Sequence, residues 1–214
     1  MTLPDLNRDE LYRYARHLAL PGVGVDGQRK LKAGRVLCVG AGGLGSPLAL
    51  YLAAAGVGTL GMVDFDTVDE SNLQRQLLHG TSDIGRSKLD SASDRIAEVN
   101  PHVELIRHPT ELTSKNALQI FSGYDVIVDG TDNFPSRYLL NDYCVREGLV
   151  WFYGGVAAAY GVAMPILPGR TPCLRCVFPH PPPPEHAPTA DTVGILAPIA
   201  HLVASIQAAE AIKI

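Results

Sequence analysis

The sequence predicts an α/β protein with a doubly wound, mostly parallel sheet, a Rossmann-like nucleotide-binding half and helices at the N-terminus. Two observations predict this class. Short apolar runs of strand type alternate with helical patterns along most of the chain, and a glycine-rich turn follows the first strand. At 214 residues the chain is long enough for one such domain. We therefore expect a single domain over residues 1–214. Because the chain ends inside a helical pattern, we also expect a C-terminal part that is absent or truncated.

Charge and composition exclude several classes of protein. The formal net charge is -4, and no basic run interleaved with aromatic residues appears, which argues against nucleic-acid binding. The N-terminus carries charges every few residues and has no apolar core of the signal-peptide type. Residues 36–63 hold no charge and could cross a bilayer, but their glycines, proline and strand-turn-helix-strand pattern favour a buried unit. We expect a cytoplasmic protein with no nucleic-acid or membrane partner.

Two helices are expected before the first strand. Residues 10–20 place apolar side chains near one face of a helix, and Pro21 and Gly22 end the pattern. A shorter helix at 27–31 leads to the first strand. Arg16 lies on the first of these helices, where a solvated surface charge is the usual interpretation.

The chain is organised around residues 36–66. A strand-type run leads into Gly40, Gly42 and Gly45 with the spacing G-x-G-x-x-G, then into a helical pattern and a second strand that ends at Asp64. The glycines allow a tight turn and a close approach to phosphate, and the helix N-terminus offers unpaired N–H groups to an anion. Asp64 is placed to accept hydrogen bonds from ribose hydroxyls. The pattern predicts a bound nucleotide, although a glycine turn that only packs a helix on a sheet has the same spacing.

A polar segment follows the second strand, at the edge of the sheet where α/β proteins keep their sites. An ordinary solvated loop is the alternative. Lys88 then begins a helix at 88–99, and a cation is unfavourable at a helix start, which singles out Lys88 as a functional residue. The polar residues of the segment are Asp66, Asp69, Ser71, Asn72, Gln74, Arg75 and Gln76.

The second half of the chain continues the alternation. A buried strand at 124–129 is followed by Asp132, which we expect to point into the same crevice as the glycine turn. The other expected elements are a strand at 103–106, a helix at 115–121 capped by Ser114, a helix at 135–147, a strand at 149–153, antiparallel strand structure at 157–167 across Gly161, and an apolar helix at 196–214.

Cys173 and Cys176 form a C-x-x-C pair, which is typical of half a tetrahedral zinc site or of a redox pair. Structural zinc takes four ligands, and the chain has no second C-x-x-C. Three alternatives stay open: zinc on Cys173 and Cys176 completed by residues outside this chain, zinc completed by His180 and His186, or two thiols without metal. The other two cysteines lie within apolar elements as ordinary core residues.

These motifs together resemble the MoeB/ThiF family, bacterial relatives of ubiquitin-activating enzymes that adenylate small ubiquitin-like sulfur carriers. The resemblance runs through RYARHLALPGVG, GAGGLGSP, DFDTVDESNLQRQ, IGRSK, DGTDN, CLRC and AAEAIK. A glycine fingerprint alone is shared with many dehydrogenases, whereas SNLQRQ followed by IGRSK and TDN is not. The resemblance implies a single adenylation domain that binds ATP and Mg²⁺ and forms a homodimer.

The resemblance also implies a role for each candidate residue. Arg16 resembles an arginine finger that reaches into the neighbouring subunit's site, which replaces the surface-charge interpretation. Asp132 would hold Mg²⁺, and Asp64 the ribose. The implied catalytic residues are Arg16, Arg75, Lys88 and Asp132. The implied nucleotide-binding residues are Gly40, Gly42, Gly43, Gly45, Asp64, Asp66, Ser71, Asn72, Leu73, Gln74, Arg75, Lys88, Asp132 and Asn133.

The implied reaction is attack of the carrier's C-terminal Gly-Gly carboxylate on the α-phosphate of ATP, with loss of pyrophosphate. Two anions approach each other, and the nucleophile is already ionised at neutral pH, so the site needs cations more than a general base. The rival function is an NAD-binding Rossmann oxidoreductase, which does not explain Arg75 and Lys88 together with Asp132. A third is a scaffold that binds a carrier without activating it.

Two departures from the family bear on these expectations. Many members carry a cysteine in the loop before the last helix, and the matching position here is Ala190. The chain either stops at the adenylate or carries an engineered change there. It also ends at Ile214 inside a helical pattern, where longer relatives continue with more strands and a second C-x-x-C. Carriers for thiamin, molybdopterin and tRNA thiolation share a Gly-Gly tail, and the sequence selects none of them.

Overall fold

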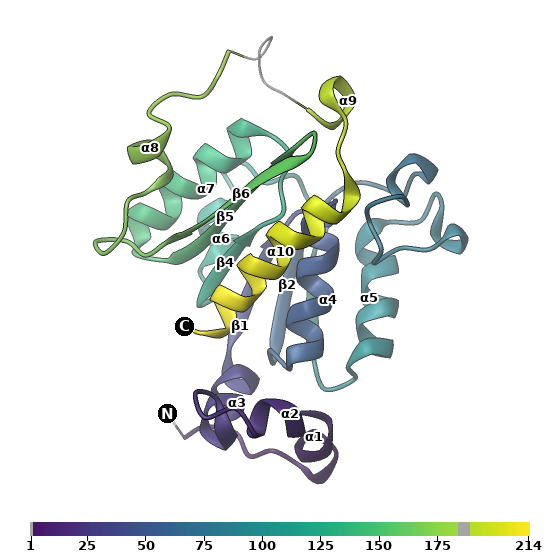
Figure 1. Cartoon of the computed structure of the whole chain (residues 1–214), viewed down its shortest axis with the longest axis vertical. Helices are drawn as coiled ribbons and strands as arrows, with labels where there is room; N and C mark the ends of the chain where they lie inside the picture. The colour runs from purple at the N-terminus through teal and green to yellow at the C-terminus, as the bar shows by residue number, and fades with distance from the viewer. Residues whose placement is uncertain (1, 184–188) are drawn as a thin grey trace.

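The computed structural model describes residues 2–183 and 189–214, and a six-stranded sheet forms its centre. The strand order is β3-β2-β1-β4-β5-β6 (Figure 1). The first five strands of the chain run parallel, and β6 pairs antiparallel with β5. This arrangement confirms the predicted mostly parallel α/β sheet. The strands are β1 (Arg35–Val39), β2 (Thr59–Val63), β3 (Glu104–His108), β4 (Val126–Asp129), β5 (Val150–Ala157) and β6 (Tyr160–Ile166).

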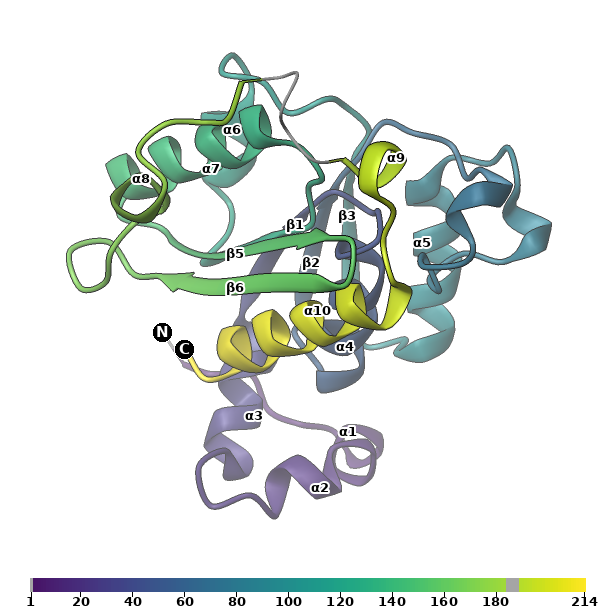
Figure 2. The same ribbon diagram turned by 45° about the horizontal axis from the view of Figure 1, so that its top comes forward.

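Helices cover both faces of the sheet, as expected for a doubly wound fold (Figure 2). One apolar core joins the sheet to α4, α5 and α10, and a second joins its other face to α6, α7 and α8. The helices are α1 (Arg8–Arg13), α2 (Ala15–Leu18), α3 (Gly24–Ala33), α4 (Gly45–Ala55), α5 (Lys88–Val99), α6 (Ala117–Phe121), α7 (Phe134–Glu147), α8 (Leu174–Val177), α9 (Ala190–Val193) and α10 (Ala197–Ile212), with short 3-10 turns η1 (Glu70–Asn72) and η2 (Thr81–Asp83).

Strand β1 shows how the sequence builds two cores. Val36 and Cys38 contribute to the core under α4, α5 and α10, whereas Leu37 and Val39 contribute to the opposite one. Alternate side chains of a strand point to opposite faces, so a fully apolar strand is buried on both sides. The uncharged stretch at 36–63 is therefore β1, α4 and β2 of the buried unit. In the described part of the chain, no helix combines the length and apolar character needed to cross a membrane.

Two local predictions were wrong, each for a tertiary reason. The helix expected at 10–20 is two helices, α1 and α2, that meet at Tyr14. Tyr14 is buried, and its hydroxyl accepts a hydrogen bond from Asn100 Nδ2 at 2.8 Å, a contact that fixes its position from outside the helix. The antiparallel strand structure predicted across Gly161 is confirmed, because β6 contains Gly161 and pairs antiparallel with β5, with Val156 opposite Gly161.

The second error concerns α6, which begins at Ala117 rather than residue 115 and has Asn116, not Ser114, at its N-terminal boundary. The Ser114 carbonyl instead accepts a hydrogen bond from the Tyr143 hydroxyl of α7 at 2.7 Å. The hydrogen bond from Tyr143 of α7 thus holds Ser114 outside α6, although the sequence pattern assigned Ser114 to the cap of that helix.

Candidate functional site

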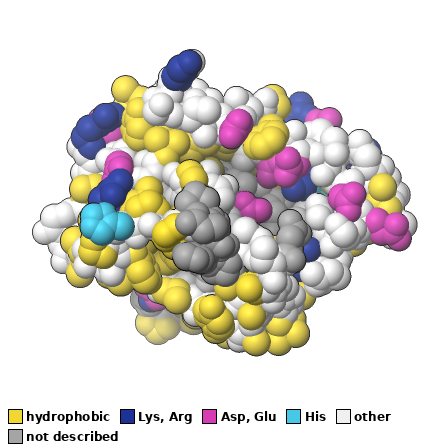
Figure 3. Space-filling view, turned by 90° about the horizontal axis from the view of Figure 1, so that it is seen from above, with side chains coloured by type: hydrophobic (Ala, Val, Ile, Leu, Met, Phe, Trp, Pro, Cys, Tyr) yellow, Lys and Arg dark blue, Asp and Glu magenta, His cyan; other side chains and the backbone are white. Residues whose placement is uncertain are grey.

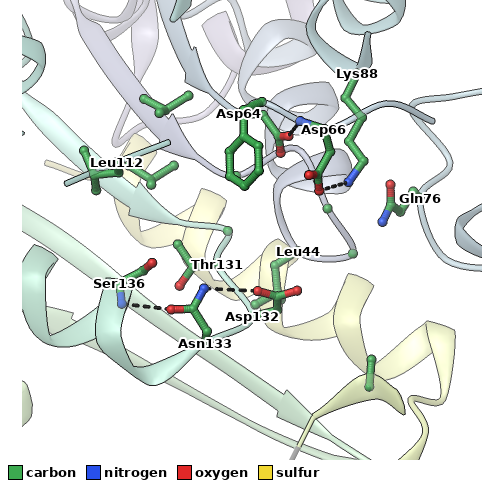
Figure 4. Close-up of a pocket in the computed structure, with 18 of the residues that line it drawn as sticks. Leu44, Asp64, Asp66, Gln76, Lys88, Leu112, Thr131, Asp132, Asn133 and Ser136 are labelled. Carbon is green, nitrogen blue, oxygen red and sulfur yellow. Dashed lines mark hydrogen bonds and ion pairs between the residues drawn. The ribbon is translucent and has the colours of Figure 1, made fainter. Parts of the chain in front are cut away.

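A cavity of about 220 Å³ lies at the carboxyl ends of β1, β2 and β4 (Figure 4). It occupies the point where the strand order reverses, the usual ligand site of doubly wound sheets. Figure 3 looks onto this end of the molecule, where acidic side chains stand beside a hollow near the centre. The lining includes nine of the predicted residues: Gly40, Gly42, Gly43, Asp64, Asp66, Arg75, Lys88, Asp132 and Asn133.

The glycine turn needs its glycines for steric reasons. Gly40 has φ +96°, in the left-handed region that favours glycine. A Cβ on Gly45 would lie 1.8 Å from the Gly40 carbonyl oxygen, so any larger residue there would displace the turn. Gly45 itself begins α4 and does not line the cavity. The role of Gly45 in this structure is to let the start of α4 approach the backbone of the glycine turn.

Asp64 joins the end of β2 to this turn. Its Oδ2 accepts a hydrogen bond from the Ala41 N–H at 2.7 Å, and its Oδ1 accepts one from the Asp66 N–H at 2.8 Å. A carboxylate oxygen has more than one lone pair, so each can still accept from a ligand hydroxyl. The predicted position of Asp64 beside the turn is therefore present, and its contact with a ribose stays a prediction.

Two cationic side chains approach the turn from the segment between β2 and α5. Lys88 Nζ donates to Asp66 Oδ2 at 2.8 Å, and only 7% of the Lys88 side chain is exposed (Figure 4). The Arg75 guanidinium donates to the Ser71 carbonyl at 3.2 Å. The backbone carbonyl of Arg75 accepts a hydrogen bond from a ring nitrogen of His201 at 3.0 Å. Because His201 belongs to α10, this bond fixes Arg75 against that helix. Both cations are held where an anion on the turn would meet them.

Asp132 faces the cavity from the loop after β4. Its Oδ1 accepts a hydrogen bond from Asn133 Nδ2 at 3.3 Å, and Asn133 in turn caps α7 by accepting from the Ser136 N–H at 2.9 Å (Figure 4). Asp132 is exposed and its remaining lone pairs are available to a ligand.

A buried pair beneath this loop fixes its backbone. Asp129 accepts hydrogen bonds from both the N–H and the hydroxyl of Thr131, at 2.9 and 2.7 Å. The Arg137 guanidinium donates a hydrogen bond to the Thr131 carbonyl at 2.9 Å. Its Nε atom lies 3.8 Å from Asp129 Oδ2. Burial raises the pKa of Asp129, and the nearby Arg137 charge opposes that rise. Asp129 and Arg137 therefore hold the loop that carries Asp132, because Asp129 binds the N–H and the hydroxyl of Thr131 and Arg137 binds its carbonyl.

Some predicted residues lie outside the cavity. Arg16 is exposed on α2, among the N-terminal helices at the opposite end of the molecule from α9 and the cavity (Figure 1). It cannot reach the cavity of its own chain. The lining also lacks Gly45, Ser71, Asn72, Leu73 and Gln74.

Comparison with known proteins identifies the family. The sequence profile of the ThiF family matches residues 14–214. The chain belongs to the ThiF family. It is 49% identical over 213 residues to the probable adenylyltransferase/sulfurtransferase MoeZ of Mycobacterium tuberculosis, covering 98% of this chain and 54% of that protein. It is 47% identical over 209 residues to the adenylyltransferase and sulfurtransferase MOCS3 of Culex quinquefasciatus, covering 98% of this chain and 48% of that one. The chain thus spans about half the length of these relatives.

Solved structures show the same fold. The E. coli MccB crystal structure matches with a TM-score of 0.82 at 24% identity, covering 97% of this chain and 63% of that one. Selenomethionine PaaA matches with a TM-score of 0.81 at 22% identity, covering 100% of this chain and 67% of that one. Both likenesses confirm the predicted Rossmann-like architecture of this ThiF family protein.

Several lining residues were not among the predicted site residues. One group follows β3 and contains Thr110, Glu111 and Leu112. The rule that sites follow strand ends would have found this group. The remaining lining residues come from the ends of β1, β2 and β4 already considered or from more distant segments: Val39, Leu44, Val63, Phe65, Gln76, Gly130, Thr131, Ser136, Arg137, Val156, Ala190, Ile195 and Ala200.

The C-x-x-C pair lies at α8, outside the cavity. The Cys173 and Cys176 sulfurs are 3.6 Å apart, a separation that one metal ion could bridge. Among the described residues, no cluster of three or more His, Cys, Asp or Glu could hold a metal. His186, one of the ligands considered, lies outside the described residues. Zinc binding stays a prediction, which the zinc content of the purified chain would test.

His79 lies behind the glycine turn and makes stability depend on pH. Its ring nitrogens bond Ser91 Oγ at 2.8 Å and the Ala41 carbonyl at 3.4 Å, and burial lowers its pKa. The unfolded chain binds this proton near the ordinary pKa of about 6.5, whereas the folded chain binds it only at lower pH. Stability is therefore full above that value, and we expect the free energy of unfolding to fall as the pH drops below it.

Urea denaturation at about pH 7.5 and about pH 5.5 checks this pH dependence. The His79→Gln variant should lose less stability between the two pH values than the unmodified protein. An equal loss in both would contradict the role given to His79. His108, whose pKa is also lowered by burial, contributes in the same direction, so His108→Gln shows how much of the loss belongs to the other site.

Proposed function

We propose that this protein adenylates the C-terminal Gly-Gly carboxylate of a small ubiquitin-like sulfur carrier, using ATP and releasing pyrophosphate. The observation that carries the proposal is one cavity in which the glycine turn, Lys88, Arg75 and Asp132 come together. The names of relatives that are 47–49% identical, an adenylyltransferase/sulfurtransferase in each case, support it.

The residues suit a reaction between two anions. The carrier's carboxylate oxygen forms a bond to the α-phosphorus, and the bond from that phosphorus to the pyrophosphate oxygen breaks. Negative charge gathers on the phosphoryl oxygens, and Lys88 and Arg75 offset it without having to move. The ion pair with Asp66 holds the Lys88 ammonium in place. Because the carboxylate is ionised near neutral pH, the reaction needs no general base.

Asp132 is suited to hold Mg²⁺ together with the substrate's phosphates. Mg²⁺ is usually bound by one or two carboxylates, phosphate oxygens and water rather than by a cage of protein ligands. The exposed carboxylate of Asp132 at the cavity supplies the protein ligand. When bound, the ion would neutralise charge on the triphosphate.

Arg16 fits the site of a second copy of the chain. It is exposed at the end of the molecule away from the cavity, and among the described residues its side chain forms no ion pair or hydrogen bond. In a symmetric dimer, each subunit can offer its own Arg16 to its partner's cavity. We therefore include a homodimer with shared sites in the proposal.

The first test is ATP–pyrophosphate exchange with Mg²⁺, with and without ubiquitin-like carriers that end in Gly-Gly. Exchange that depends on the carrier is expected. No exchange across a panel of carriers, despite measurable ATP binding, would instead favour a scaffold that binds a carrier without activating it. Binding of NAD in place of ATP would favour the oxidoreductase alternative, which leaves Arg75, Lys88 and Asp132 without a role.

The cavity lining carries alanine at the position where the family resemblance implies a cysteine. Ala190 begins α9 and lines the cavity, so a thiol at this position would face the adenylate. We expect Ala190→Cys to form a covalent carrier adduct: the thiolate attacks the acyl carbon, AMP leaves and a thioester remains. Non-reducing electrophoresis with ATP and a carrier detects this adduct, and Ala163→Cys, on β6, serves as the control. No adduct at position 190 would count against its place beside the reacting carbonyl.

A further inference from the structure

One end of the cavity lies away from Lys88. Leu112 lines the side opposite Lys88, with Asp64 between them (Figure 4). Phe65 and the segment from Thr110 to Leu112 complete this end. An aromatic ring and an aliphatic side chain suit the flat, largely apolar faces of a purine base. If the triphosphate meets Lys88 and Arg75, the base of the same nucleotide extends toward Leu112.

The segment at this end has unused backbone hydrogen-bonding groups. Among the residues that the structure describes, the N–H groups of Glu111 and Leu112 have no partner, nor do the carbonyls of Thr110 and Leu112. Backbone groups that are not paired within the protein are expected to bond water or a ligand. Adjacent donors and acceptors of this kind match the edge of a nucleobase, which carries both.

A single amide fixes the shape of this segment. Asn116 Nδ2 donates to the Glu111 carbonyl at 2.8 Å and to Thr110 Oγ1 at 3.4 Å. Its Oδ1 accepts from the Thr113 N–H at 2.8 Å and from the Thr113 hydroxyl at 3.2 Å. Asn116 therefore ties together both ends of the turn whose middle lines the cavity. Asn116 does not itself line the cavity, so it would act through the backbone that it holds.

A second contact anchors the same turn from outside. The Tyr143 hydroxyl of α7 donates to the Ser114 carbonyl at 2.7 Å. The Tyr143 ring packs edge-on against Phe121 of α6. This anchor fixes the turn relative to α7, the helix that begins just after Asp132. It therefore relates the position of the turn to that of the anion end of the cavity.

We propose that Asn116 is a positioning residue that holds Thr110–Leu112 as the nucleobase edge of the cavity. This inference rests on the proposed function, because it takes a nucleoside triphosphate as the ligand. It adds to that function a residue that acts on the base and not on the phosphates. The contribution of the base to binding can therefore be measured separately from that of the phosphates.

The test compares binding of MgATP with binding of magnesium tripolyphosphate, which has the phosphates but no nucleoside, by calorimetry. Asn116→Asp keeps the acceptor for Thr113 and replaces the donor to Glu111 with a carboxylate oxygen that repels the carbonyl. We expect it to weaken MgATP binding by about tenfold, the effect of one unsatisfied hydrogen-bonding group. Tripolyphosphate binding should stay within about twofold of the unmodified protein. Ser122→Ala is the matched control, because Ser122 bonds the Gln119 carbonyl at the other end of α6.

Each result decides the inference. Unchanged MgATP binding in Asn116→Asp, or an equal loss for both ligands, would overturn it while leaving the proposed function intact. Failure of the unmodified protein to bind MgATP would overturn both. If Asn116→Asp does not fold, as judged by circular dichroism, Tyr143→Phe decides instead. It must weaken MgATP binding selectively, and an unselective or absent effect would overturn the proposal.

Discussion

Replacing Asp132 with alanine should reduce carrier-dependent ATP–pyrophosphate exchange to background, a fall of about a thousandfold or more. The physical reason is that, in the function proposed above, the Asp132 carboxylate holds Mg²⁺ beside the triphosphate. Without that ion, the charge that develops on the phosphoryl group is left to the cationic side chains of the site. Lys88 is already paired with Asp66, which weakens its effect on a second anion.

The fold should survive this substitution. Asp132 is exposed and its carboxylate accepts one hydrogen bond, from Asn133, so the change in the free energy of unfolding should stay within about 0.5 kcal/mol. Asp94→Ala is the control, since Asp94 is an exposed acid that pairs with Arg86 away from the cavity. Urea denaturation and exchange assays on both variants check the prediction. Undiminished exchange in Asp132→Ala would remove Asp132 from the mechanism.

The fold was predictable where local signals agreed with tertiary packing. The glycine spacing after β1 predicted the β1-α4-β2 unit, because the turn geometry at Gly40 leaves no room for another residue type. The helix predicted at 88–99 has those bounds in the structure. Prediction failed where a residue distant in sequence determined the local conformation. Asn100 binds Tyr14 at the break between α1 and α2, and Tyr143 of α7 binds the turn before α6.

The candidate site likewise contains residues that the sequence predicted and residues that it did not. Asp64, Lys88 and Asp132 follow strand ends or begin a helix, so their position along the chain placed them at one edge of the sheet. Ile195 and Ala200 reach the cavity from a segment more than sixty residues beyond Asp132, and apolar residues there carry no signal of a ligand. Asn116 has no sequence signal at all for its role, because its effect depends on which backbone groups the turn brings within reach of its amide.

Arg16→Ala should lower carrier-dependent exchange by about a thousandfold, the magnitude typical of a lost arginine finger. The loss should occur although Arg16 lies far from the cavity of its own chain (Figure 1). Stability should hardly change, because Arg16 is an exposed residue whose side chain pairs with no other described residue. Arg13→Ala is the matched control: Arg13 belongs to the neighbouring helix α1, and its guanidinium donates to the Val99 carbonyl.

Mixing the two inactive variants separates action within one chain from action across a dimer. In a mixed dimer, the cavity of the Arg16→Ala subunit keeps Asp132 and receives the intact Arg16 of its partner. The other cavity has neither group. Random exchange of subunits at equal amounts makes about half of the dimers mixed, so about a quarter of the unmodified activity should return. If Arg16 acted on its own cavity, neither cavity of a mixed dimer would hold both groups, and mixing would restore nothing. The experiment therefore tests the oligomeric state and the role of Arg16 together, since neither alone can return activity to two inactive chains.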